Sequence, residues 1–452
     1  MLSKTRLFFR KISRSPGSYR ALRSKSHRAQ NPAPFKWGLP LRHDKIDLHV
    51  DFEARVSLRH EEQKEIILKR VMVIMGTRPE AIKLAPVIHA LKRAEDFQPI
   101  VMATGQHKDM LASVVTRFDL PVDHELDVMR PDQTLSGLTA RLLAAMDPVL
   151  EAESPDITLV QGDTTSVLVG ALASFYRGIP VGHVEAGLRT GQMMAPFPEE
   201  ANRLLATRLA HLHFAPTQRA HDKLLEEQID PATVFVTGNT VIDALQMELA
   251  RQNQESEDPS IHSQLAEELG SDWKEHPFVL ITGHRRESFG PGFEEICSAI
   301  HDLATRFPDF RFIYPVHLNP RVREPVQRTL SDVENVRLIE PTPYGPFVAL
   351  LNACHLVLTD SGGVQEEAPS LGKPVLVMRE TTERPEGIEA GTVRLVGTQH
   401  ERIVDEVSRL ISNEEAYREM AEAANPYGDG KASGRILDAL RGFFDGQIPR
   451  AW

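Results

Sequence analysis

Short apolar runs alternate with segments of helical spacing along the first half of the chain. The apolar runs have the length of buried strands and cover residues 70–75, 99–104, 156–160 and 180–184. Segments such as residues 81–93 follow them and carry apolar residues at the spacing of an amphipathic helix. Strands that alternate with helices predict a parallel sheet with helices on both faces.

The same alternation starts again after a polar, helical stretch at residues 239–274. The second set of apolar runs covers residues 278–282, 310–315, 336–339, 356–358 and 374–378. A chain of 452 residues is long enough for two such units. We therefore predict an α/β fold with two Rossmann-like, doubly wound domains that face a cleft. The first domain is expected at residues 71–238 and the second at residues 239–434.

The chain before these units has a different charge from the rest. Residues 1–43 contain eleven Lys and Arg and no Asp or Glu, whereas the net charge of the whole chain is −11. An acidic body argues against nucleic acid as a partner. The basic segment has the composition of an organelle transit peptide, and it could also be translated sequence upstream of the true start. Because prolines interrupt any helix there, we predict that residues 1–70 form a disordered extension without a catalytic role.

The composition also indicates the kind of cellular compartment in which the protein works. No apolar run approaches the length that spans a bilayer, so we expect no membrane partner. Cys297 and Cys354 are the only cysteines, which argues against a disulfide framework or a cysteine-based zinc site. Two isolated cysteines favour a reducing compartment, and we predict a cytoplasmic protein.

The turn Ser361-Gly362-Gly363 is the clearest candidate for a binding site. It lies between the end of an apolar strand and the start of a helix, where free backbone N–H groups and the helix dipole favour a phosphate. Glu366 and Glu367, one helical turn further on, are candidates for accepting ribose hydroxyls. An ordinary strand–turn–helix connection is the alternative interpretation.

The first half of the chain repeats this design. Gly76 follows the first strand, and Arg78 and Lys83 supply positive charge beside the turn, which favours an anion site over two surface cations. Asp163 and Glu185 each follow the end of a strand, where doubly wound sheets place their ligands. A carboxylate at such a place can instead cap a helix, more plausibly for Asp163 than for Glu185.

Several kinds of chemistry lack a sequence signal. The chain has no dinucleotide-binding glycine motif, no P-loop and no zinc-protease motif. His183 and Glu185 resemble a pair of metal ligands but have no third ligand nearby. We therefore expect neither NAD nor any other cofactor, and no metal. Phosphate-binding turns, carboxylates and His284 together fit a sugar nucleotide and acid–base chemistry at its sugar.

Ordered sequence blocks follow one another from about residue 71 to about residue 440. They are Met75-Gly-Thr-Arg-Pro-Glu-Ala-Ile-Lys83, Gln161-Gly-Asp-Thr-Thr165, Gly182-His-Val-Glu-Ala-Gly-Leu-Arg-Thr190, Pro198-Glu-Glu-Ala-Asn-Arg203, Gly238-Asn-Thr-Val-Ile-Asp243, Thr282-Gly-His-Arg-Arg-Glu287 and Asp360-Ser-Gly-Gly-Val-Gln-Glu-Glu-Ala-Pro369. In these blocks the chain resembles the non-hydrolysing UDP-N-acetylglucosamine 2-epimerase family. Because the blocks are several and keep their order, the resemblance is specific.

The resemblance implies a glycosyltransferase-B-like fold, in which the last helix, residues 435–444, returns to the first domain. It implies interconversion of UDP-N-acetylglucosamine and UDP-N-acetylmannosamine for surface polysaccharides, without NAD or a required metal, by a homodimer. The implied mechanism eliminates UDP to a 2-acetamidoglucal and adds it back. Gln106 fits the pattern of a second, activating site for UDP-N-acetylglucosamine, and that regulation is left open.

The resemblance also assigns residues by their place in the blocks. The acid–base candidates are Asp163, Glu185 and Glu199, and His284 is expected at the diphosphate. Which carboxylate is base and which is acid stays open. Substrate-binding positions are matched by Arg78, Lys83, Phe347, Ser361, Gly362, Gly363, Glu367 and Arg384.

Three other functions fit parts of the same pattern. A retaining glycosyltransferase shares the fold and the nucleotide turn, but it would release UDP only in the presence of an acceptor. A hydrolysing epimerase would release free N-acetylmannosamine and UDP. A sensor would bind a sugar nucleotide without turnover, and the full set of acid–base carboxylates argues against it.

Overall fold

The structure is a computed structural model that describes residues 68–105, 108–130, 132–254, 259–285 and 288–449. Residues 1–67, and with them nearly all of the predicted extension, lie outside this part of the chain. No helix within the described ranges is long and apolar enough to cross a membrane.

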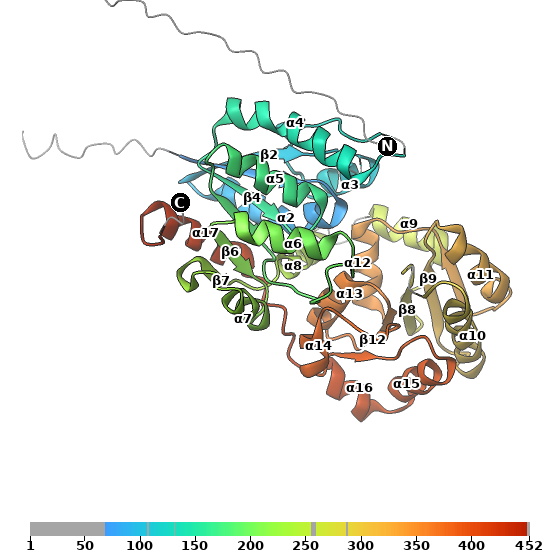
Figure 1. The fold of residues 1–452 in the computed structure, drawn as a ribbon. Helices are drawn as coiled ribbons and strands as arrows, with labels where there is room; N and C mark the ends of the chain where they lie inside the picture. The colour runs from blue at the N-terminus through green and yellow to red at the C-terminus, as the bar shows by residue number, and fades with distance from the viewer. Residues whose placement is uncertain (1–67, 106–107, 131, 255–258, 286–287, 450–452) are drawn as a thin grey trace, which may run out of the picture. The chain divides into compact units, whose positions relative to one another are not determined.

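The first half of the described chain forms a parallel sheet with helices on both faces (Figure 1). Its strands are β1 (Lys69–Met75), β2 (Phe97–Ala103), β3 (His124–Glu125), β4 (Ile157–Gln161), β5 (Val181–Val184), β6 (Leu212–Ala215) and β7 (Val234–Val236). Its helices are α2 (Arg78–Arg93), α3 (Lys108–Arg117), α4 (Leu135–Glu153), α5 (Thr165–Tyr176), α6 (Glu199–Leu209), α7 (Gln218–Glu226) and the short 3₁₀ helix η1 (Pro231–Thr233). Two further helices lead to the second sheet, α8 (Thr240–Gln254) and α9 (Pro259–Leu269).

The second half repeats the plan. Its strands are β8 (Phe278–Thr282), β9 (Arg311–Pro315), β10 (Val336–Ile339), β11 (Leu356–Thr359), β12 (Val375–Val377) and β13 (Val393–Leu395). Its helices are α10 (Pro291–Arg306), α11 (Pro320–Leu330), α12 (Tyr344–Ala353), α13 (Gly362–Glu367), the 3₁₀ helix η3 (Ala368–Leu371), α14 (Pro385–Glu389), α15 (His400–Ser412), α16 (Glu414–Ala421) and α17 (Ala432–Phe444).

The strand order shows that both sheets are doubly wound. The first sheet has the order β3-β2-β1-β4-β5-β6-β7 and the second has the order β10-β9-β8-β11-β12-β13 within the described residues. In each sheet the chain reverses its direction of winding between two neighbouring strands, β1 and β4 or β8 and β11. Such a switch point opens a crevice at the carboxyl ends of the strands, where ligands bind. The sheets confirm the predicted fold class.

Strand β1 shows why its apolar run becomes a central strand. Side chains alternate between the two faces of a strand, so a strand that is covered on both sides must be apolar throughout. Val71, Val73 and Met75 belong to the hydrophobic cluster under α2, whereas Met72 and Ile74 belong to the cluster on the opposite face.

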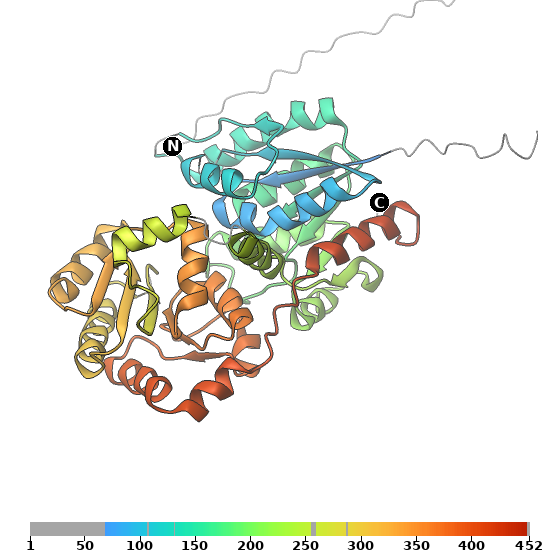
Figure 2. The ribbon, with the colours of Figure 1, turned by 180° about the vertical axis from the view of Figure 1, so that it is seen from behind.

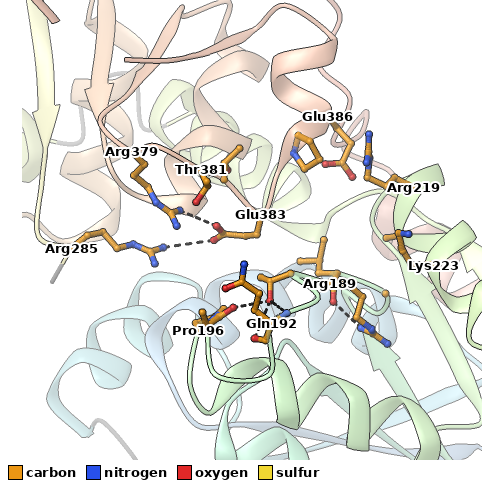
Figure 3. Close-up of a pocket in the computed structure, with 17 residues that line it drawn as sticks. Arg189, Gln192, Pro196, Arg219, Lys223, Arg285, Arg379, Thr381, Glu383 and Glu386 are labelled. Carbon is orange, nitrogen blue, oxygen red and sulfur yellow. Dashed lines mark hydrogen bonds and ion pairs between the residues drawn. The ribbon is translucent and has the colours of Figure 1, made fainter. Parts of the chain in front are cut away.

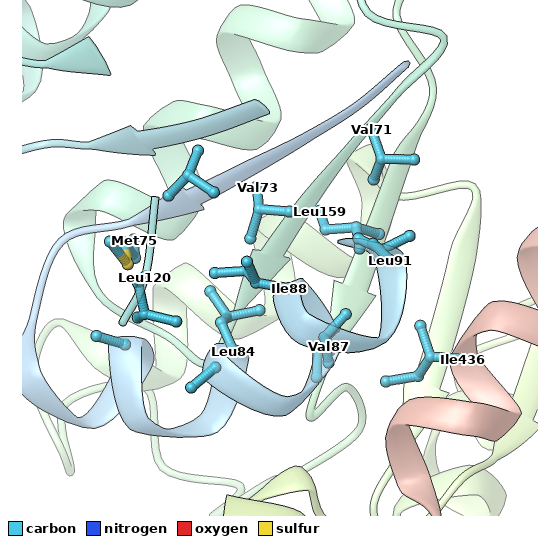
Figure 4. Close-up of a cluster of buried hydrophobic side chains, with 14 of the residues drawn as sticks. Val71, Val73, Met75, Leu84, Val87, Ile88, Leu91, Leu120, Leu159 and Ile436 are labelled. Carbon is cyan, nitrogen blue, oxygen red and sulfur yellow. The ribbon is translucent and has the colours of Figure 1, made fainter. Parts of the chain in front are cut away.

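The last helix packs on the first sheet's side of the chain. Figure 4 shows Ile436 of α17 beside Val87 and Leu91 of α2, and all three belong to the cluster that also contains β1. Figure 2 shows the same two helices side by side from behind. Helix α17 begins at Ala432, where the Asp243 carboxylate accepts the backbone N–H groups of Ala432 and Ser433 at 3.1 and 2.8 Å. A carboxylate that accepts free N–H groups stabilises a helix start.

Candidate active site

A cavity of about 610 Å³ opens at the carboxyl ends of both sheets and draws its walls from both halves of the described chain. Every residue that the family resemblance assigned to the catalytic and substrate-binding positions lines it. From the first half these are Arg78, Lys83, Asp163, Glu185 and Glu199, and from the second half His284, Phe347, Ser361, Gly362, Gly363, Glu367 and Arg384. The cavity brings the predicted residues together, while the role of each residue stays a prediction.

Asp163 lies in the turn between β4 and α5, and two side chains of α6 hold it there. Arg203 donates from Nε to Asp163 Oδ2 at 3.0 Å, and Asn202 donates to the Asp163 carbonyl at 2.8 Å. Its side chain is 31% exposed, so the carboxylate is held in place and still reaches the cavity. It does not cap α5, because the N-cap of that helix is Thr164.

The adjacent carboxylates Glu199 and Glu200 have different environments. Glu200 is buried and accepts hydrogen bonds from the backbone N–H groups of Thr190 and Gly191 at 3.1 and 3.0 Å, and from Arg203 at 2.9 Å. Glu199 lines the cavity, and its buried Oε2 has no hydrogen-bond partner in the part of the chain that the structure describes. Of the two, Glu199 is therefore the carboxylate available to a ligand.

Glu185 follows β5 directly and has a backbone φ of 65°, in the left-handed region that a residue with a side chain rarely adopts. Lys83 donates to Glu185 Oε2 at 2.6 Å, and Gln161 donates to the same oxygen. Burial raises the pKa of Glu185, which the neighbouring Lys83 ammonium only partly offsets. Residues held in unfavourable backbone conformations cluster at functional sites, so this one supports the assignment of Glu185 to the site.

An ion network joins the two halves across the cavity. Lys83 of α2 lies 2.6 Å from Glu185 and 3.2 Å from Glu366 of α13, and Arg384 donates from Nε to Glu366 at 2.6 Å. Burial opposes ionisation, but Arg384 and Lys83 hold the pKa of Glu366 below its ordinary value. Glu366 was predicted to accept a ribose hydroxyl. Its carboxylate is instead 1% exposed within this network and does not line the cavity.

The glycine turn lies where the sequence placed it, but the helix after it is short. Helix α13 runs only from Gly362 to Glu367 before the chain changes to the 3₁₀ helix η3, so the helix dipole contributes less than a long helix would. Gly362 packs directly on Arg384, since a Cβ added there would come within 2.5 Å of the Nη1 atom of Arg384. Glu367 accepts a hydrogen bond from the Tyr344 hydroxyl at 2.8 Å, and burial raises its pKa to about 7.

A second, smaller cavity of about 420 Å³ adjoins the first and shares Pro196, Arg285 and Glu383 with it. Figure 3 shows Arg285 and Arg379 converging on the Glu383 carboxylate, at 3.7 and 2.9 Å. Arg384 donates to the same carboxylate at 2.6 Å. Burial opposes ionisation of Glu383, but these guanidinium groups hold its pKa well below its ordinary value. The rim between the cavities is thus rich in guanidinium groups, which suit phosphate oxygens.

Sequence reasoning missed one buried carboxyl of the site. Glu80 is 3% exposed, lines the main cavity and accepts the Gly76 backbone N–H at 2.5 Å. Burial raises its pKa to about 7. The spacing Thr77-Arg-Pro-Glu80 is that of a capping box at the start of α2, and that spacing was the available signal.

His183 has a structural environment. Its Nε2 lies 2.7 Å from the Gly162 carbonyl, and burial lowers its pKa to about 3. Within the described ranges, no group of three His, Cys, Asp or Glu side chains could hold a metal ion. Gln106, Arg286 and Glu287, which belong to the predicted second site and to a sequence block, lie outside the described residues.

Comparison with known proteins finds similar sequences that cover most of the chain. A family model described as UDP-N-acetylglucosamine 2-epimerase matches residues 89–441. The UDP-N-acetylglucosamine 2-epimerase of Escherichia coli (strain K12) is 54% identical over 372 residues, which cover 82% of this chain and 98% of that protein.

Solved structures with a similar fold carry the same description. The UDP-GlcNAc 2-epimerase from Neisseria meningitidis bound to UDP-GlcNAc has a TM-score of 0.77 and 47% identity, covering 82% of this chain and 99% of that one. The enzyme from Methanocaldococcus jannaschii in complex with UDP-GlcNAc and UDP has a TM-score of 0.70 and 32% identity, with coverage of 82% and 99%. With the pair of doubly wound sheets and the matching blocks along its length, this chain belongs to the UDP-N-acetylglucosamine 2-epimerase family.

Proposed function

We propose that this protein interconverts UDP-N-acetylglucosamine and UDP-N-acetylmannosamine by inverting carbon-2 of the sugar. One observation carries the proposal. A single cavity holds three carboxylates from the first half, Asp163, Glu185 and Glu199, opposite a glycine turn and cationic side chains from the second half. Acid–base groups on one side and phosphate-binding groups on the other suit a sugar nucleotide.

The chemistry follows from the substrate. The hydrogen on carbon-2 is not acidic, because no carbonyl group adjoins that carbon, so simple deprotonation and reprotonation is too slow. A base instead removes this proton while the bond from carbon-1 to the UDP oxygen breaks, which leaves a 2-acetamidoglucal and UDP. UDP then adds back to carbon-1 while an acid delivers a proton to the opposite face of carbon-2. This route needs groups on both faces of the sugar and a firm hold on UDP.

The proposed hold on UDP uses the second half and one edge of the first. Ser361, Gly362 and Gly363 offer hydroxyl and backbone donors to the diphosphate, and Arg78 and His284 add cationic or neutral donors. Phe347 offers an apolar surface for the uracil ring. Glu367, already fixed by Tyr344, would accept from the ribose. Retained in this way, UDP stays beside the glucal between the two steps.

The test is incubation with UDP-N-acetylglucosamine in deuterium oxide, followed by NMR of the sugar, without added NAD or metal. We expect UDP-N-acetylmannosamine that carries deuterium at carbon-2. Asp163→Asn is the matched control and should incorporate far less deuterium. A product that keeps its original hydrogen would exclude the elimination route, and free N-acetylmannosamine would indicate a hydrolysing enzyme.

We also propose that the protein acts as a homodimer in a reducing compartment such as the cytoplasm. The family resemblance supports the dimer. Cys297 and Cys354 support the compartment, since both are free and buried, and burial raises the pKa of each thiol to about 12. Light scattering of the purified protein at micromolar concentration should give twice the mass of one chain.

A further inference from the structure

A buried carboxylate lies behind His284, next to the glycine turn. Asp360 follows β11 and is 2% exposed. Its Oδ2 accepts the backbone N–H groups of His284 and Arg285 at 2.7 and 2.8 Å. Its Oδ1 lies 3.2 Å from Nδ1 of the His284 ring. One side chain thus holds both the backbone and the ring of the same histidine.

The sheet explains why Asp360 reaches this loop. Strands β8 and β11 are neighbours, with Thr282 paired to Thr359, so the loops that follow them start side by side. Asp360 joins the His284 loop to Ser361, the first residue of the glycine turn. A single residue therefore sets the spacing between two groups that are both proposed to contact the diphosphate.

The ion-pair contact at Nδ1 also bears on which ring nitrogen carries the hydrogen. An ionised carboxylate can only accept, so the Nδ1 beside Asp360 must carry its hydrogen, and Nε2 is left for a ligand. Burial opposes ionisation, but the His284 ring and the two backbone N–H groups hold the pKa of Asp360 below its ordinary value. The His284 side chain is 42% exposed, and its ring stacks on His317 with centroids 5.5 Å apart, which limits its rotation.

We propose that Asp360 is a positioning residue that fixes the tautomer and the orientation of His284 so that Nε2 meets the diphosphate. The inference rests on the proposed epimerase function and deepens it. When the ring also carries a hydrogen on Nε2, the Asp360 carboxylate balances its positive charge, as UDP leaves with negative charge on its oxygen.

The alternative is that Asp360 only ties two loops together. Asp360→Asn separates these roles, because the amide oxygen can still accept both backbone N–H groups while the amide NH₂ turns toward Nδ1. That change places a donor in place of an acceptor beside Nδ1 and removes the charge. Asp360→Ala removes both functions and should also weaken folding.

The experiment is a double-mutant cycle with Asp360→Asn and His284→Gln, measured by turnover and by calorimetric titration with UDP. We expect Asp360→Asn to lower kcat by about a hundredfold, while the Kd for UDP changes by less than about threefold. In the His284→Gln background, adding Asp360→Asn should lower kcat by less than about threefold, because the two residues act as one unit. An undiminished hundredfold loss in that background would overturn the proposal.

A second readout does not depend on activity. In protein labelled with ¹⁵N-histidine, the His284 signals, assigned by their loss in His284→Gln, should show a hydrogen on Nδ1 in the wild type and a different tautomer in Asp360→Asn. Unchanged signals would overturn the proposal even if turnover falls. If the wild type shows this tautomer and binds UDP but does not epimerise, the proposed function fails and the positioning role stands.

Asp243→Asn is the matched control. Asp243 is also buried, at 4% exposure, and also accepts two backbone N–H groups, but it holds the start of α17. It should lower the melting temperature without affecting the His284 signals or the kcat of the folded protein. If Asp243→Asn lowers kcat as much as Asp360→Asn does, the effect of Asp360 is merely structural.

Discussion

The two halves of the chain share one strand order but use the same position differently. After the fourth strand of the first sheet, Asp163 is 31% exposed and its carboxylate reaches the cavity while Arg203 holds it. After the corresponding strand of the second sheet, Asp360 is 2% exposed and faces backbone N–H groups and a histidine. The switch point of each sheet therefore places an aspartate at the same position. The hydrogen-bond donors around that aspartate decide whether its carboxylate reaches the cavity or supports another residue.

The segments that follow the first strand of each sheet, β1 and β8, also differ between the two halves. Helix α2 starts at Arg78, almost directly after β1, which brings Lys83 of its next turn into the cavity. After β8 a longer loop carries His284 and Arg285 before α10 begins at Pro291. After its first strand, the first half thus presents side chains from a helix, whereas the second half presents loop residues that are supported by Asp360.

We propose a division of roles in which the first half carries the acid–base chemistry and the second half holds UDP. The largest effect is expected when the first half's carboxylates are removed one at a time. Asp163→Asn, Glu185→Gln and Glu199→Gln keep the shape of each side chain but remove its charge and its proton. General acid–base groups contribute about 10²–10⁴-fold, so each variant should lose at least about a hundredfold in kcat. The affinity for UDP, measured by calorimetry, should change far less, because we propose that the diphosphate is held mainly by the second half. If UDP binding falls in step with kcat, these residues hold the nucleotide and the division is wrong.

Each half also contains one carboxyl whose pKa is raised to about 7 by burial, Glu80 and Glu367. Below the ordinary value of 4.5 both states of the protein carry the proton. Between that value and about 7 the unfolded chain releases the proton and the folded protein keeps it, so this contribution to stability is lost as the pH rises. Each shift is worth no more than about 3.5 kcal/mol.

Glu80→Gln and Glu367→Gln should therefore gain stability relative to the wild type as the pH rises from 5 to 8. Urea unfolding at several pH values measures the difference. Asp360→Asn should show no such trend in this range, because the lowered pKa of Asp360 affects stability only as the pH falls below the ordinary value of 3.8. Equal pH dependence in the wild type and both Gln variants would mean that neither carboxyl stays protonated in the folded protein.

The glycine turn offers a matched pair of smaller changes. A Cβ at Gly362 would come within 2.5 Å of Arg384 and displace it, whereas a Cβ at Gly363 would find its nearest atom, Glu367 Oε2, only at 4.0 Å. Gly362→Ala should therefore lower the free energy of unfolding by about 1–3 kcal/mol and weaken UDP binding about tenfold. Gly363→Ala should leave the melting temperature nearly unchanged. Equal destabilisation by both substitutions would show that the contact between Gly362 and Arg384 does not matter.

The smallest effect is expected outside both halves. Deleting residues 1–68 should leave kcat almost unchanged, because every residue assigned to the site lies at residue 78 or later, in the two α/β halves. A loss of more than about tenfold, or about 1.4 kcal/mol in the barrier, in a truncated protein that still folds would show that the extension belongs to the site.

The sequence by itself determined the positions of the strands and of the polar residues that follow them. Apolar runs predicted the strands, because a strand covered on both faces leaves no room for polar side chains. Polar residues directly after those runs, such as Asp163, Glu185 and Ser361, line the cavity, since carboxyl ends of parallel strands meet at one edge of a sheet. The resemblance then gave Glu199, which no local pattern had marked as different from Glu200.

Only the tertiary structure decided which of these residues face each other. The pairing of β8 with β11 joins residues far apart in the chain and places Asp360 behind His284. The contact of Lys83 with Glu366 joins the two halves, and it leaves the Glu366 carboxylate buried outside the cavity. The tertiary structure also set the pKa values. Burial raises the pKa of Glu80, whereas the His284 ring and two backbone N–H groups outweigh burial and lower the pKa of Asp360.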